Sequence, residues 1–144
     1  MMEPDRTKRL EPKFGSPWLE LSFVCKRLHH RLFVRGDRIF ASALLDRLHR
    51  VLSELPENDM AIIREEGLSL YHHLKNELPQ AIEHRRREIQ LIEMLQESLR
   101  QSVSEGKFDG KYAERILGRM NTRGLVERRE ILAALEADLW MNKH

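Results

Sequence analysis

Histidine is the residue type in this chain whose placement most suggests chemistry. The sequence contains seven histidines, four of them in the adjacent pairs His29-His30 and His72-His73. Adjacent helical residues point about 100° apart, so neither pair can hold one metal ion from a single helix face. A di-iron bundle needs Glu-x-x-His on two helices, and the nearest match is one Asp46-x-x-His49. We therefore predict no metal and no cofactor. A metal-binding helical bundle is kept as the second alternative, with the candidate ligands His29, His49, His72 and His84.

The single cysteine, Cys25, is the candidate nucleophile. It shares an apolar stripe with Leu21 and Leu28, and His29 follows one turn later. A thiol inside a helix, with no carboxylate on that face to orient the histidine, lacks the surroundings that activate a cysteine. We interpret Cys25 as a small core residue and predict that the chain is not an enzyme. A lone cysteine forms no disulfide within the chain, which favours a reducing, cytoplasmic location.

The densest basic run is Arg85-Arg86-Arg87. On a helix the three side chains spread over about 200°, and Glu83 can pair with Arg87 four residues later, so we interpret the run as a solvated, ion-paired face. The whole chain has a net charge of +2. Its two ends are basic and its middle, residues 36–106, is acidic, a distribution that permits complementary docking between protein surfaces.

A second basic stretch lies near the C-terminus. Residues 116–129, ILGRMNTRGLVERR, resemble the passage from recognition helix to wing in MarR-type winged-helix repressors. The resemblance implies a helix in the DNA major groove followed by a β-wing. The next residues, EILAALEADLW, predict an amphipathic helix in place of that wing, so we assign the chain to no family. Nucleic-acid binding is the first alternative function, with the candidate contacts Arg119, Arg123, Arg128 and Arg129.

The elements that carry these residues are predicted to be helices, because apolar residues recur at spacings of three and four. Ser16-Pro17 and Asp37 are helix starts, and Gly36 is a helix end. Pro79 predicts either a tight break or a kink in one continuous helix, and we expect the break. Gly67 lies on an apolar stripe, which indicates close packing or a bend. The expected helices cover residues 17–35, 37–54, a segment that begins after Asn58 or Asp59 and ends near 74, 79–104, 111–124 and 127–141.

These segments predict an all-α fold, an antiparallel bundle of five or six helices. Residues 16–144 form one domain, with a four-helix body at 16–106 and a C-terminal helical hairpin at 107–144. Residues 1–15 are polar, contain two prolines and predict a flexible N-terminal arm. No run reaches the roughly 20 apolar residues of a membrane span, so we expect no membrane contact.

The function class that fits these patterns is a non-enzymatic protein–protein interaction or regulatory module, either self-associating or a subunit of a larger assembly. Apolar residues extend beyond one stripe on the first and fourth predicted helices, and this predicts exposed apolar surface on an isolated chain. The candidate interface residues are Phe23, Phe33, Leu91 and Met94.

Overall fold

The computed structural model describes residues 16–55, 61–119 and 124–143, and every regular element in these ranges is a helix. The all-α class is thereby confirmed. The predicted arm at residues 1–15 and the predicted caps Asn58 and Asp59 lie outside the described residues. In chain order the elements are α2 (Pro17–His29), the π-helical turn η1 (His30–Val34), α3 (Arg38–Ala43), α4 (Leu45–Glu54), α5 (Ala61–Leu74), α6 (Leu78–Ser104), α7 (Gly110–Arg119) and α8 (Val126–Lys143).

The predicted helix starts are confirmed. The Ser16 hydroxyl accepts a hydrogen bond from the Leu19 amide at 3.4 Å, and the Asp37 carboxylate accepts one from the Phe40 amide at 3.0 Å. Gly36 has a φ of 64°, the left-handed geometry in which glycine ends a helix. The segment 37–54 differs from its prediction, because the Leu44 amide donates to the Ala41 carbonyl three residues back, at 3.0 Å, and this tightened turn separates α3 from α4. The break lets Leu44 and Leu45 both pack against the core.

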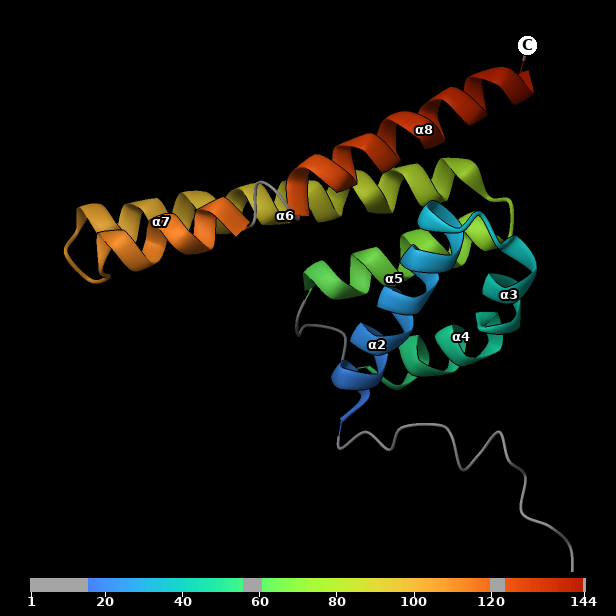
Figure 1. The fold of residues 1–144 in the computed structure, drawn as a ribbon, viewed down its shortest axis with the longest axis horizontal. Helices are drawn as coiled ribbons and strands as arrows, with labels where there is room; N and C mark the ends of the chain where they lie inside the picture. The colour runs from blue at the N-terminus through green and yellow to red at the C-terminus, as the bar shows by residue number, and fades with distance from the viewer. Residues whose placement is uncertain (1–15, 56–60, 120–123, 144) are drawn as a thin grey trace, which may run out of the picture.

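Helices α2, α4 and α5 surround the main apolar core, and α3 closes one end of it (Figure 1). The core consists mainly of the stripe residues that the spacing predicts, among them Leu21, Val24, Cys25, Leu28, Leu48, Val51, Leu70 and Leu74. Gly67 lies where the three helices meet. A Cβ atom at this position would lie 3.1 Å from both Leu21 Cδ1 and Leu52 Cδ2, so the glycine is explained by close packing.

This packing makes Gly67 intolerant of a larger side chain. Gly67→Val should destabilise the protein by about 1–3 kcal/mol, because the added methyl groups overfill a closed core. Gly118 in α7 has no neighbouring atom within 4 Å of the point where a Cβ atom would lie, so Gly118→Ala should instead stabilise by up to about 1 kcal/mol through helix propensity. Urea unfolding of both variants measures the difference, and equal effects would contradict the packing explanation.

The expected break before Pro79 is confirmed. Helix α5 ends at Leu74, Asn76 takes a φ of 61°, and α6 begins at Leu78. The turn brings α6 back antiparallel to α5, and the buried Ser69 hydroxyl donates to the Ala81 carbonyl at 2.8 Å. Helix α6 has 27 residues, about 40 Å, and so continues well past the start of α5.

The two C-terminal helices, α7 and α8, were expected to form a hairpin. In the structure each of them packs mainly on α6. Both lie along α6, with α8 on its first half and α7 on its outer half, and both run antiparallel to it (Figure 1). The outer half of α6 and α7 together project from the body, and we call this pair the helical extension. Within the described ranges, no helix has the length and apolarity that a bilayer crossing requires.

Candidate functional site

The helical extension exposes an apolar face that continues the surface on which α5 packs. His84 and Glu88 belong to one stripe of α6, and within the body this stripe faces α5, where His84 Nδ1 lies 2.5 Å from Glu65 Oε2. The same stripe continues at a spacing of three and four with Leu91 and Leu95. Helix α5 begins at Ala61, so it does not extend along this outer part, and Leu95 is 51% exposed.

Helix α7 covers the adjacent stripe of α6. Its contact residue Ala113 is 2% exposed, and Gly110 lies against Val103 of α6. On α7, Tyr112 and Ile116 precede Ala113 and Leu117, which lie on the α6 side. On α6, Leu91 and Leu95 precede the buried residues Ile92 and Gln96. In an antiparallel helix pair, residues that precede the contact positions on both helices fall on the same side. Tyr112 and Ile116 therefore share a side with Leu91 and Leu95.

We call this surface the extension face. It is apolar and accessible: Leu95, Tyr112 and Phe108 are 51%, 52% and 39% exposed, and the rings of Phe108 and Tyr112 stack with their centroids 5.5 Å apart. Large aromatic side chains are the residues that most often dominate the energy of protein interfaces. The extension face comprises Leu91, Leu95, Phe108, Tyr112 and Ile116.

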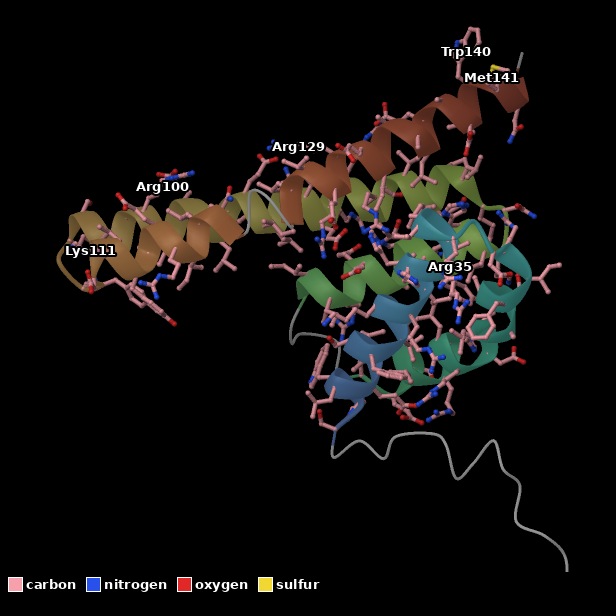
Figure 2. The ribbon with its side chains drawn as sticks, in the orientation of Figure 1. Arg35, Arg100, Lys111, Arg129, Trp140 and Met141 are labelled. Atoms are coloured by element: carbon pink, nitrogen blue, oxygen red, sulfur yellow. The ribbon has the colours of Figure 1, made fainter. Side chains whose placement is uncertain are left out.

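The α7 edge of this face is basic. Lys111 and Arg115 are exposed, and neither forms an ion pair with a described residue. On α6 and in the turn after it the charges are compensated, because Arg100 lies 3.7 Å from Glu97 and Lys107 lies 2.8 Å from Glu105. Figure 2 places Lys111 at the outer end of the extension and Arg100 on the side away from α2 and α5. The uncompensated positive charge therefore lies on α7.

The four predicted interface residues fall in two different places. Leu91 belongs to the extension face, and Met94 is 62% exposed about one-sixth of a turn further round α6. Phe23 and Phe33 are half-buried in the body: Phe23 packs below the Arg27 guanidinium, 5.4 Å from the ring centroid, and Phe33 contacts the His29 and His73 rings at 5.3 and 5.6 Å. The structure thus does not bring the four residues together, and Phe108, Tyr112 and Ile116 join the site instead.

Of the four arginines predicted as nucleic-acid contacts, Arg128 is held in a buried ion network. Its Nε donates to Glu88 Oε2 at 2.6 Å and its Nη2 to Glu66 Oε2 at 3.2 Å, while Arg85 Nη1 donates to Glu88 Oε1 at 2.6 Å. Arg129 is exposed and lies 3.3 Å from Glu93. The Arg119 side chain and Arg123 lie outside the described residues. The geometry therefore gives Arg128 a structural role, joining α8 to α5 and α6.

Electrostatics within the network follow from its burial. Glu88 is fully buried, and burial raises the pKa of its carboxyl group although Arg85 and Arg128 act in the opposite direction. Burial also acts to lower the pKa of Arg128, but Glu88 and Glu66 outweigh this effect and raise it. The Arg128 guanidinium consequently stays charged and paired.

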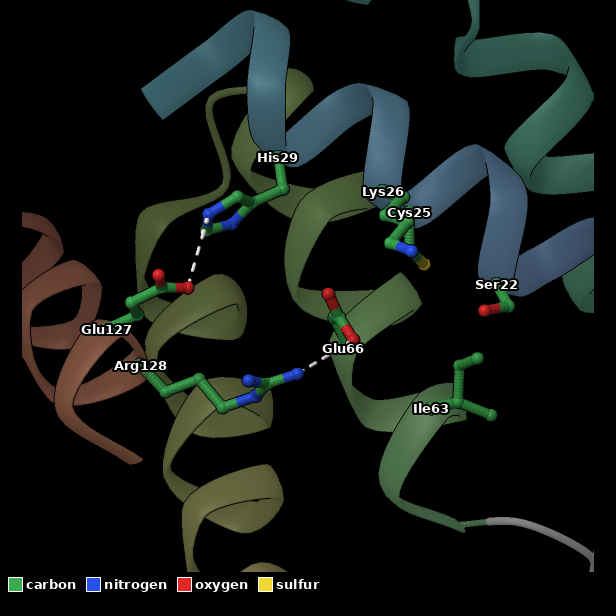
Figure 3. Close-up of a pocket in the computed structure, with 8 residues that line it drawn as sticks. All are labelled: Ser22, Cys25, Lys26, His29, Ile63, Glu66, Glu127 and Arg128. Carbon is green, nitrogen blue, oxygen red and sulfur yellow. Dashed lines mark hydrogen bonds and ion pairs between the residues drawn. The ribbon is translucent and has the colours of Figure 1, made fainter. Parts of the chain in front are cut away.

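A pocket of about 470 Å³ lies beside this network, between α2, α5 and the start of α8 (Figure 3). Its lining includes Cys25, His29 and Glu127, and His29 Nε2 lies 3.7 Å from Glu127 Oε2. Burial, with Glu66 and Glu88 nearby, raises the pKa of the Cys25 thiol well above 9.0, and burial lowers the pKa of His29. The thiol is therefore protonated at neutral pH, and Cys25 is not an activated nucleophile.

The four candidate metal ligands do not gather around one point. His72 and His84 stack with their ring centroids 5.4 Å apart, His49 stacks on Tyr71, and His29 lies elsewhere, beside Phe33. Their nitrogens serve local pairs, as His72 Nδ1 does at 3.3 Å from Glu77. The ranges that the structure describes contain no group of three or more His, Cys, Asp or Glu side chains that could hold a metal ion.

Histidine burial does predict a pH effect on stability. Burial, with Arg38 and Arg85 nearby, lowers the pKa of His73 below 6.5, and its buried Nδ1 has no hydrogen-bond partner among the described residues. Because the folded state favours the neutral ring, this stability is present above pH 6.5 and is lost as the pH falls below it. We expect His73→Phe to lose less stability than the parent chain between pH 7 and pH 5 in urea unfolding. An unchanged loss would contradict this assignment.

Comparisons with known proteins provide no further guide to this site. No protein family, curated protein or solved structure matches the chain.

Proposed function

We propose that this chain is a non-enzymatic protein–protein interaction module whose docking surface is the extension face. The observation that supports this proposal is the contiguous set of large apolar side chains exposed on one side of the extension. Exposed apolar patches of this kind are typical of interaction sites in proteins that are otherwise well packed.

The surroundings of the face also favour a docking role. The apolar centre, with a stacked aromatic pair at one end, is flanked by the basic edge at Lys111 and Arg115. An apolar centre with a polar rim is the usual composition of a protein interface. The α6 stripe under the face is also the one that accepts α5 within the body, so an α-helix is the shape that fits it.

Substitution of Leu95 tests the proposal. Leu95→Glu introduces a charge at the centre of the face, at a side chain that is already half exposed, so the fold should persist while partner capture from native extract falls by more than about tenfold. Ile39→Glu is the matched control, because Ile39 is 88% exposed and lies on α3. Cross-linking with quantitative mass spectrometry measures both. Equal partner recovery for the two variants would contradict the proposal.

A further inference from the structure

The extension face continues the side of α6 on which α5 packs within the body. Within the body, α5 lies against the α6 stripe that contains His84 and Glu88. Near its start, α5 packs through Ile62 on Ile89 and Ile92 of α6. The extension face continues the same stripe of α6 beyond this point. A helix placed on the line of α5 would meet the side of α6 that carries Leu91 and Leu95 and the side of α7 that carries Tyr112. Three helices packed in this way complete a bundle around the extension.

The charge on the α7 edge defines the partner further. Residues 110–119 contain Lys111, Arg115 and Arg119 against one carboxylate, Glu114. A helix that carries acidic side chains beside an apolar stripe therefore complements the face in charge as well as in polarity.

The outer end of α8 has these properties. Its inner face packs on α6 through Ile131 and Leu135, whereas Trp140 and Met141 are 60% and 67% exposed. Figure 2 shows both side chains at the outer end of α8, pointing away from the body. Residues 133–143 contain Glu136, Asp138 and Lys143. Glu136 lies 3.4 Å from Arg86 of α6, so Asp138 supplies the negative charge that a second chain can meet.

The two surfaces lie at opposite ends of the molecule. Helix α7 projects from one end and the last turns of α8 from the other (Figure 1). A chain therefore presents both surfaces at once, each accessible to another molecule. When two different patches at opposite ends are complementary, the resulting contact is heterologous and joins copies head to tail.

We propose that the extension face binds the Trp140-bearing end of α8, which carries Asp138, from a second copy of this chain. Trp140 and Met141 would pack on Leu95 and Tyr112, and Asp138 would pair with Lys111 or Arg115. This inference rests on the proposed docking function of the extension face and identifies the partner as the chain itself.

Complementation between two variants tests the head-to-tail contact by sedimentation velocity on the full chain. The parent protein should form concentration-dependent oligomers larger than dimers. Leu95→Glu, which disables the face, and Trp140→Ala, which disables the α8 end, should each weaken self-association by more than about 100-fold. An equimolar mixture of the two variants retains one intact pair of surfaces and should form a 1:1 dimer and nothing larger.

Circular dichroism and thermal melting confirm that each variant is folded, and Met141→Glu replaces Trp140→Ala if the latter is not. A parent chain that stays monomeric overturns the inference. A dimer of the parent chain that the variant mixture does not restore also overturns it, because that result indicates a contact between identical surfaces. In both cases loss of partner capture by Leu95→Glu would still support the docking function, whereas unaltered capture would remove both proposals.

Discussion

Glu88→Ala is expected to destabilise the protein by about 3–5 kcal/mol, the usual cost of removing one partner from a buried ion pair. Glu88 is fully buried and accepts hydrogen bonds from both Arg85 and Arg128. Without it, the Arg85 guanidinium remains 1% exposed with no anion beside it on α6, and its Nε already has no hydrogen-bond partner among the described residues. Urea unfolding followed by circular dichroism measures the loss.

Glu93→Ala is the matched control for this prediction. Glu93 is also on α6 and also pairs with an arginine of α8, at 3.3 Å from Arg129, but both side chains are more than half exposed. Exposed pairs contribute about 0–1 kcal/mol, so the two variants should differ by at least about 2 kcal/mol. A difference below about 1 kcal/mol would contradict the role given to burial. If Glu88→Ala does not fold, Glu88→Gln, which keeps one acceptor, supplies the comparison.

Tyr112→Ala should weaken association through the extension face by about 2 kcal/mol or more, roughly a 30-fold loss in affinity, with little effect on folding. Tyr112 is half exposed, so its removal leaves no cavity in the core, but it also removes the stacking partner of Phe108. Fluorescence anisotropy or sedimentation of the labelled chain measures the affinity.

Val126→Ala is the control for Tyr112→Ala. Val126 is 48% exposed, about as much as Tyr112, but it lies at the start of α8. Its truncation should leave the affinity unchanged within about twofold. If both substitutions weaken binding equally, the effect is not specific to the extension face and the aromatic pair is not its anchor.

The sequence predicts the fold class and most helix boundaries because these depend on local features. Ser16 and Asp37 cap helix starts, and Gly36 ends a helix, through contacts within one helical turn. The apolar stripe of α2 can be recognised from the spacing of its residues in the sequence. The break at Leu44 could not be predicted in this way, because leucine has no helix-breaking chemistry and the turn forms only in the packed protein. The positions of α7 and α8 along α6 depend equally on tertiary packing.

The candidate site is only partly predictable for the same reason. Leu91 and Met94 stand out in the sequence because they widen the apolar arc of one helix. Tyr112 and Ile116 become part of the surface only through the register of α7 on α6, which no local pattern encodes. Arg85 interrupts an apolar repeat and resembles a solvated residue in the sequence, whereas in the structure Glu88 pairs with it inside the protein.

The most direct test of the docking surface is the mobility of a spin label at Ser98, an exposed α6 residue beside the extension face. Ser98→Cys can be labelled selectively, since Cys25 is 2% exposed and burial raises its pKa. The label should lose mobility as the protein associates or when native extract is added, while a label at the exposed Ser42 of α3 stays mobile. Unchanged mobility at Ser98 in a sample that has demonstrably associated would contradict the assignment of this surface.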